Sequence, residues 1–358
     1  MQWKSVQQDA PAFLWDEATL QKAEWRYLSD AGLASGAVKC LDTACQGELV
    51  VSSLTADALA SLELEGEVVP RDRMEICVRH HLGLPVEASL PTFTTHENCA
   101  AEVMVRVLQR IAAPPTLDAM NEFGERLAQP DLSEEAASPF SPMTTYRDRQ
   151  NELAGFVRWY GVMSRNEDEN SPLLKAGLTH LWFESIHPFR YGSGIVGRAL
   201  AEKVLLLRTP GMFFTPLAPV LQRRRNEYFS LLDRACKDRD ATEWLLWFSA
   251  AAIEAVRQQH AVVSFINART RLLGELRDHI GQRQESLLRH LFDQALEGRG
   301  HGISVAAHAE RANLNDAEAA ADLSGLAGHG ALERKDAGHY CLATQLVPVQ
   351  QVEIADIV

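Results

Sequence analysis

Residues 179–200 constrain the fold of this chain more than any other stretch. Apolar residues recur at every third or fourth position up to Ile186, which predicts a helix with one buried face. His187 precedes Pro188, and because a residue before proline avoids the α region, the helix should end there. Apolar spacing resumes after residues 192–194, so the stretch predicts two helices joined by a glycine-containing turn.

The predicted turn has the composition of an anion site. Gly192, Ser193 and Gly194 would let several backbone N–H groups point at one position, where the positive end of the next helix adds its field. Arg198 lies one turn further on and could reach the same anion, with His187 on the opposite rim. These residues favour a site for a phosphate group. A structural turn is the alternative, because a histidine beside proline and two spaced glycines are each common.

The same residues resemble the signature of the Fic family, His-Pro-Phe-x-(Asp/Glu)-Gly-Asn-Gly-Arg-x-x-Arg. Six of its nine fixed positions are present, namely His187, Pro188, Phe189, Gly192, Gly194 and Arg198. The resemblance implies a mainly α-helical Fic bundle that transfers AMP from ATP to a Ser, Thr or Tyr hydroxyl of a target protein. It implies His187 as the general base. It also implies that Gly192, Ser193, Gly194 and Arg198 hold the phosphates.

Three signature positions differ, and each carries chemistry in the family. Tyr191 stands in place of the acid that holds Mg²⁺, and a neutral phenol is a poor ligand for a hard cation. Ser193 replaces asparagine but keeps a donor. Ile195 replaces the first arginine and removes a charged contact to the triphosphate. We therefore expect AMP transfer to be weak, altered or lost. ATP and Mg²⁺ are implied only by the resemblance, and no metal ligands are assigned.

An upstream segment, residues 61–66, resembles the inhibitory motif of some Fic proteins, Ser/Thr-x-x-x-Glu-(Gly/Asn). The motif begins at Ser61, and the resemblance implies that Glu65 pairs with Arg198 and blocks the site at rest. From the residues alone, Glu65 is an ordinary solvated side chain at a helix end, with Gly66 as the terminating glycine.

Composition excludes several other classes of protein. The chain has 358 residues, of which 46% are hydrophobic, so it can form two or three cores. A net charge of −13 argues against broad affinity for nucleic acid or anionic membranes. Six cysteines without CxxC spacing indicate neither a zinc site nor a disulfide framework. No apolar run approaches the ~20 residues that span a bilayer, and no signal-like core begins the chain, so we expect a cytoplasmic protein.

The patterns predict a mainly α protein in four segments. Residues 1–85 form a helical N-terminal domain, which resembles the domain often attached to Fic proteins, and residues 86–260 form the Fic-like bundle. Residues 261–295 form a helical connector. The Pro- and Ser-rich loop at 128–148 stands where Fic proteins usually carry a β-hairpin flap, and its composition predicts that the flap is shortened or absent.

The last segment, residues 296–358, looks like a winged helix, with two helices followed by a small hairpin. Its second helix carries Asp316, Glu318 and Asp322 and no lysine or arginine. DNA phosphates would repel this helix, so contact with another protein or with a second copy of this chain is expected instead.

The sequence is compatible with three functions. One is nucleotidyl transfer to an unidentified protein target, the second is a non-catalytic regulatory or binding protein on the Fic scaffold, and the third is a different phosphate-ester chemistry. Binding of Mg-ATP despite Tyr191 and Ile195 would separate the first from the second.

Overall fold

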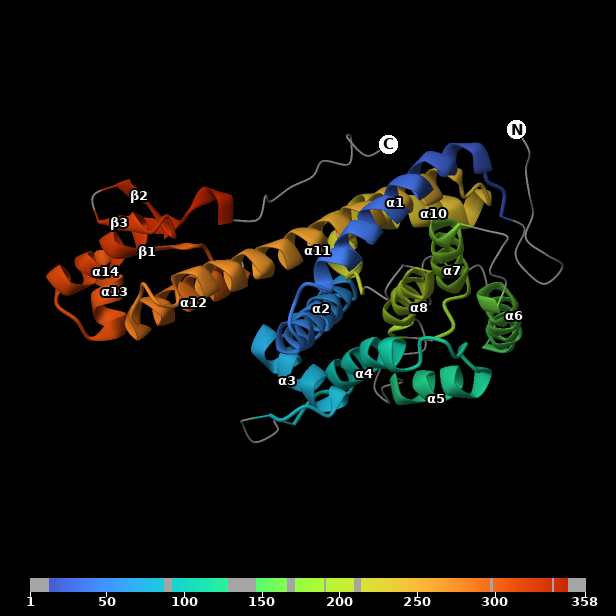
Figure 1. The fold of residues 1–358 in the computed structure, drawn as a ribbon. Helices are drawn as coiled ribbons and strands as arrows, with labels where there is room; N and C mark the ends of the chain where they lie inside the picture. Colours follow the sequence, from blue (N-terminus) through green and yellow to red (C-terminus); the bar gives the residue numbers. More distant parts are fainter. Residues whose placement is uncertain are drawn as a thin grey trace. The chain divides into compact units, whose positions relative to one another are not determined.

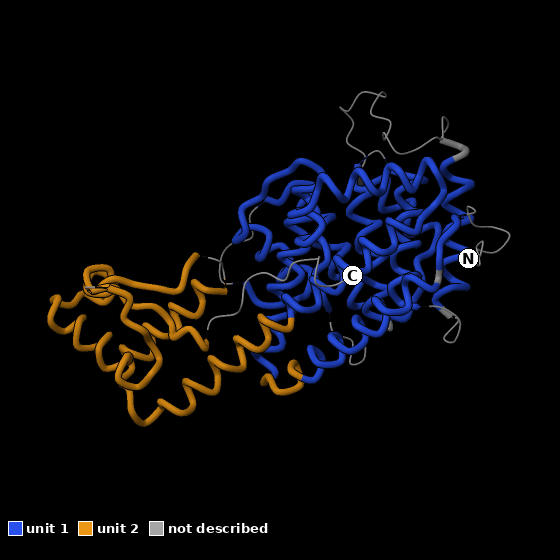
Figure 2. Tube along the Cα trace, turned by 90° about the horizontal axis from the view of Figure 1, so that it is seen from above, with its two compact units in different colours: residues 1–36, 43–259, 352–358 blue, residues 37–42, 260–351 orange. Residues whose placement is uncertain are grey.

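The computed structural model describes residues 13–86, 92–127, 146–165, 171–189, 191–208, 214–296, 299–336 and 338–346. These residues form fourteen α-helices and one three-stranded sheet, which confirms the mainly α class. The chain divides into two compact units, one of residues 1–36, 43–259 and 352–358 and the other of residues 37–42 and 260–351 (Figure 2).

The first unit is a helical bundle (Figure 1). Its helices are α1 (Glu17–Val38), α2 (Thr43–Leu64), α3 (Arg71–Leu82), α4 (Thr95–Gln109), α5 (Leu117–Leu127), α6 (Tyr146–Arg165), α7 (Pro172–Ile186), α8 (Ser193–Arg208), α9 (Ala218–Arg223), α10 (Arg225–Asp238) and the first part of α11 (Thr242–Leu276).

Helices α7 and α8 form the centre of this bundle and pack against each other. Ser171 starts α7, because its hydroxyl accepts a hydrogen bond from the Leu174 N–H at 3.1 Å and Pro172 fits the first turn. Nearly every side chain of α7 is buried. Around this pair, α2 packs against α3, α4, α8 and α9, which brings the C-terminal end of α2 to the turn between α7 and α8.

The second unit contains a short helix–helix–hairpin fold. Its elements after α11 are α12 (Gln282–Leu296), β1 (Gly302–Ser304), α13 (Val305–Ala312), α14 (Asp316–Gly328), β2 (Leu332–Asp336), β3 (His339–Leu342) and the 3-10 turn η1 (Thr344–Leu346). The antiparallel sheet has the order β1-β3-β2, with Ile303 opposite Tyr340. The two helices and the hairpin lie where the sequence placed them, whereas β1 was not foreseen. The winged-helix identity stays a prediction.

In the segment 261–295, expected to form a connector, residues 261–276 belong to α11 and residues 282–295 belong to α12. Helix α12 buries Leu287, Leu288, Leu291 and Phe292 completely in the core of the second unit. This helix therefore contributes to a core.

One side chain of α14 differs from its expected placement. Asp322 was counted among the acids that would repel DNA, but it is buried and accepts hydrogen bonds from Arg283 at 2.6 and 2.9 Å. Its Oδ2 also lies 3.1 Å from Nε2 of the fully buried His308. Of the three acids Asp316, Glu318 and Asp322, the first two are exposed, and Glu318 caps the start of its own helix with Asn315.

Candidate functional site

The turn between α7 and α8 has the predicted form. Helix α7 ends at His187, whose φ of 45° is left-handed and whose N–H donates to the Phe183 carbonyl at 3.0 Å. Gly192 has a φ of 75°, which costs glycine little, and its carbonyl accepts from the Val196 N–H at 3.0 Å as α8 begins. The helix end at His187 and the new helix after the glycine are confirmed.

Ser193 stabilises the turn itself. Its buried hydroxyl accepts a hydrogen bond from the Phe189 N–H at 3.0 Å and donates to the Phe189 carbonyl at 3.0 Å. The hydroxyl that the sequence assigned to a phosphate is therefore used within the loop. Backbone N–H groups at the start of α8 are the donors that remain for an anion.

His187 lies beside a carboxylate that sequence reasoning missed. Its Nδ1 is 3.5 Å from Oε2 of Glu184, one turn earlier on α7. Burial alone would raise the pKa of Glu184, but His187, His180 and Arg198 outweigh it and hold that pKa below its usual range. Glu184 therefore stays ionised next to the histidine. The i, i+3 spacing of the two residues was the available signal.

Behind this pair lies a fully buried His180, whose Nε2 shares a hydrogen bond of 2.8 Å with the Tyr228 hydroxyl. Burial lowers the pKa of His180 to about 4, so its ring is neutral. Gly197 allows the close packing here, because a Cβ at that position would lie 3.1 Å from Glu184 Oε1 and 3.2 Å from His180 Nδ1.

Arg198 is 1% exposed and meets the segment predicted to be inhibitory. Its Nε donates to the Ser61 hydroxyl at 3.1 Å, and its Nη2 donates to the Ser61 carbonyl at 2.9 Å and to Glu65 Oε1 at 3.2 Å. Burial alone would lower the pKa of Arg198, but Tyr228, Glu65 and Glu184 outweigh it and raise that pKa. The structure thus brings Ser61, Glu65 and Arg198 together.

The Glu65 carboxylate also covers the first turn of α8. A Cβ built on Gly194 would lie 2.2 Å from Glu65 Oε1 and 2.7 Å from Arg198 Nη1, so a larger residue would displace the Glu65 carboxylate from this position. A helix N-terminus attracts anions, and here the anion is a side chain of the same chain.

Tyr191 and Ile195 hold the two most altered signature positions. The Tyr191 hydroxyl donates to Glu67 Oε1 at 2.5 Å, and its ring stacks on His96 with centroids 3.6 Å apart. Burial and the nearby Glu67 raise the pKa of Tyr191. Ile195 is 1% exposed and packs in the core. Neither Glu67 nor His96 was predicted as a site residue, although Glu67 stands two positions after Glu65.

Other expectations fall outside what the structure describes. The loop at 128–148, where the flap is expected to be shortened or absent, lies outside the described residues at 128–145. Within the described part of the chain, no cluster of three or more His, Cys, Asp or Glu side chains is arranged for a metal ion. In the same part, every helix is too short or too polar to cross a bilayer.

The structure is similar to a crystal structure of a Fic family protein from Desulfovibrio desulfuricans G20, with 17% sequence identity, coverage of 90% of this chain and 96% of that chain, and a TM-score of 0.46. Residues 3–84 match a family model described as a domain of unknown function (DUF4172). Residues 105–205, which include the whole turn, match the model of the Fic/DOC family. The chain therefore carries a Fic/DOC family domain.

Proposed function

We propose that the turn at residues 187–198 is a phosphate-handling site that transfers a nucleotidyl group, AMP from ATP, to a hydroxyl of a partner protein. The observation that carries this proposal is the Glu65 carboxylate, which lies on Gly194 and Arg198 in the position expected for a phosphate. A site that holds a carboxylate on a helix N-terminus and a buried guanidinium can hold a phosphate in the same way.

Glu65 would then hold the site closed. Its side chain is 20% exposed, whereas Arg198 is 1% exposed, so the carboxylate can move into solvent while the arginine stays in place. Phosphate and Glu65 would compete for Arg198, and removal of the carboxylate would favour the nucleotide.

The residues present do not fit the magnesium ion that the resemblance implies. The position of the acidic ligand holds Tyr191, whose hydroxyl donates to Glu67. A donating phenol offers no ligand for a hard cation. No step of the proposed reaction therefore involves a metal.

In the proposed reaction His187 accepts the proton of the attacking hydroxyl, whose oxygen bonds to the α-phosphorus as the bond to pyrophosphate breaks. The ionised Glu184, 3.5 Å from His187 Nδ1, would stabilise the protonated ring. Backbone N–H groups of α8 and Arg198 would stabilise the charge on the phosphate under attack. Pyrophosphate leaves, and AMP remains on the partner.

The test is incubation of the purified chain with ATP labelled at the α-phosphate, with readouts of labelled protein and of released pyrophosphate. Pyrophosphate release needs no known target, because water can accept the AMP. We expect both signals to rise in Glu65→Ala and to vanish in the double variant with His187→Ala. Glu63→Ala is the matched control, since Glu63 is exposed on the same helix end. Signals that survive His187→Ala would contradict the assignment of the base.

Two residues favour a second candidate, a regulatory protein that binds a phosphate ester without transferring it. Ile195 gives no charge to a γ-phosphate, and Tyr191 gives no ligand to a metal. This candidate predicts that Glu65→Ala binds AMP and ATP about equally and releases no pyrophosphate. We propose a protein partner in either case, because the exposed Asp316 and Glu318 of α14 would repel DNA.

A further inference from the structure

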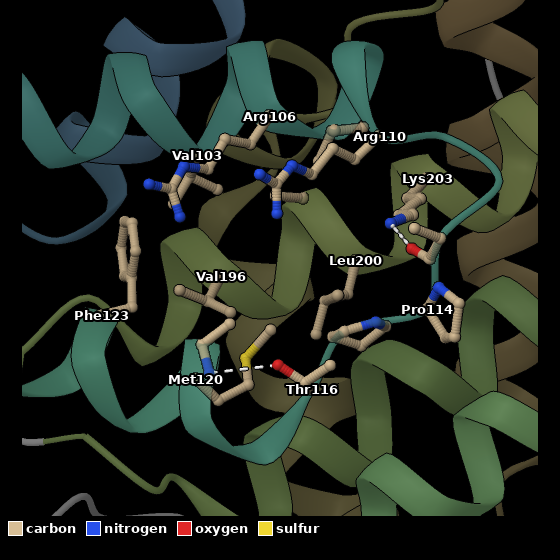
Figure 3. Close-up of a pocket in the computed structure, with 15 residues that line it drawn as sticks. Val103, Arg106, Arg110, Pro114, Thr116, Met120, Phe123, Val196, Leu200 and Lys203 are labelled. Atoms are coloured by element: carbon tan, nitrogen blue, oxygen red, sulfur yellow. Dashed lines mark hydrogen bonds between the residues drawn. The ribbon is translucent and has the colours of Figure 1, made fainter.

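A cavity of about 220 Å³ lies between α4, α5 and α8 in the first unit (Figure 3). Its walls are mostly apolar side chains from all three helices, among them Val103, Val107, Met120, Phe123, Val196 and Leu200. The residues that line it include no aspartate or glutamate. The body of any occupant would therefore be apolar.

Three cations border this apolar cavity. Arg106 lies on α4 and Arg110 directly follows that helix, with both guanidinium groups directed into the space in Figure 3, and Lys203 lies on α8. Lys203 is 6% exposed, and its Nζ donates to the Ala113 carbonyl at 2.5 Å. A buried lysine beside two arginines is costly unless an anion joins them.

One nearby carboxylate offsets part of this charge. Glu102 Oε1 lies 2.6 Å from Arg106, and the other oxygen of Glu102 lies 2.7 Å from Arg126. A single carboxylate shared by two arginines leaves Arg110 and Lys203 as the positive groups of the rim.

This cavity is distinct from the Fic turn. At 100° per residue, Gly194 and Arg198 lie on one face of α8, whereas Val196, Leu200 and Lys203 lie on the opposite face. An occupant would therefore contact the same helix from the side that faces away from Glu65.

We propose that this pocket binds a small molecule with an apolar chain or ring and one anionic head, a carboxylate or a phosphate monoester. The apolar walls would cover the body, and Arg110 and Lys203 would hold the head. Its volume is smaller than the ~300 Å³ at which pockets for drug-sized ligands begin, so a whole nucleotide does not fit.

The test uses four eight-carbon probes with the full chain: octanoate, octyl phosphate, octan-1-ol and octylammonium. Binding is followed by ligand-observed NMR. We expect octanoate or octyl phosphate to bind at least tenfold more tightly than octan-1-ol, and octylammonium not to bind. The tighter of the two anions identifies the head group.

Three variants locate the site. Ala119→Phe places a larger side chain in the wall of the cavity and should weaken binding of the anion at least tenfold. Arg110→Gln should weaken binding about threefold, because an exposed ion pair contributes little to binding. Arg271→Gln, which removes the charge of a mostly exposed arginine in the second unit, should leave binding unchanged. Thermal unfolding of each variant checks that it folds.

Two results would overturn the proposal. One is equal binding of octan-1-ol and both anions, which would show that the cations play no part. The other is unchanged binding in a folded Ala119→Phe variant, which would place the anion elsewhere. Neither result bears on nucleotide binding at Arg198.

Discussion

Arg198 in the first unit and Arg283 in the second unit both pair with a carboxylate, but opposite members of the two pairs are buried. Arg198 is 1% exposed and its partner Glu65 is 20% exposed, whereas Arg283 is 49% exposed and its partner Asp322 is 7% exposed. In the first pair the cation is fixed and the anion is accessible. In the second pair the anion is fixed, and the cation is at the surface.

The surroundings explain this difference. Arg198 is held by Ser61 and interacts with Tyr228 and Glu184, so it stays in place when Glu65 leaves. Asp322 is held by the fully buried His308 as well as by Arg283. A buried cation with a replaceable anion suits a site that exchanges ligands, whereas a buried anion between two donors suits a structural contact.

Arg198→Met should have the largest effect on stability. It leaves the buried Glu184 without one of the positive charges that keep it ionised, so we expect a loss of about 3–5 kcal/mol in the free energy of unfolding. Urea unfolding followed by circular dichroism measures this loss. A cost below about 1 kcal/mol would mean that Arg198 is not fixed by its surroundings.

Asp322→Asn should have the next largest effect on stability. The amide cannot accept from Arg283 and His308 as the carboxylate does, and a loss of about 1–3 kcal/mol is expected. The loss should belong to the second unit, so AMP binding by the variant should equal that of the natural chain. Altered AMP binding would contradict the separation of the two roles.

Glu202→Gln should change the pH dependence of stability. Burial and the neighbouring Asp57 raise the pKa of Glu202 well above its ordinary value of 4.5, and burial also raises the pKa of Asp57. The folded chain therefore keeps a proton that the unfolded chain releases, and the free energy of unfolding should fall as the pH rises above 4.5.

An amide at position 202 cannot lose that proton. Glu202→Gln should therefore flatten the decline between pH 5 and pH 8 and make the variant the more stable chain at pH 8. Urea unfolding at several pH values gives the two slopes. Parallel slopes would show that Glu202 and Asp57 are not the source of the pH dependence of stability.

Tyr191→Phe should have the smallest effect. It removes the hydrogen bond to Glu67 but keeps the ring that stacks on His96, so we expect a loss of about 0.5–1.5 kcal/mol. Thermal unfolding at fixed pH measures the change. A much larger loss would show that the position of Glu67 depends on Tyr191 through more than this one hydrogen bond.

The sequence was most informative where one residue dictates the backbone. Pro188 and the glycines placed the turn, because their conformational limits act locally. The Arg198–Glu65 contact joins residues 133 positions apart, and periodicity contains no such information. Only the resemblance to the Fic family pointed to it.

The residues that were not predicted from the sequence owe their roles to helices that pack beside them in the folded chain. Glu67 and His96 became part of the site because α2 and α4 pack beside the turn, and Asp322 became buried because α12 covers its face of α14. Strand β1 has only three residues, too few for an alternating pattern to emerge.

The most direct measurement is calorimetric titration of AMP and ATP into the natural chain, Glu65→Ala and Glu63→Ala. If Glu65 occupies the phosphate position on Gly194 and Arg198, Glu65→Ala should bind at least tenfold more tightly than the natural chain, and Glu63→Ala should match the natural chain. Equal affinity of Glu65→Ala and the natural chain, with both variants folded, would contradict the account.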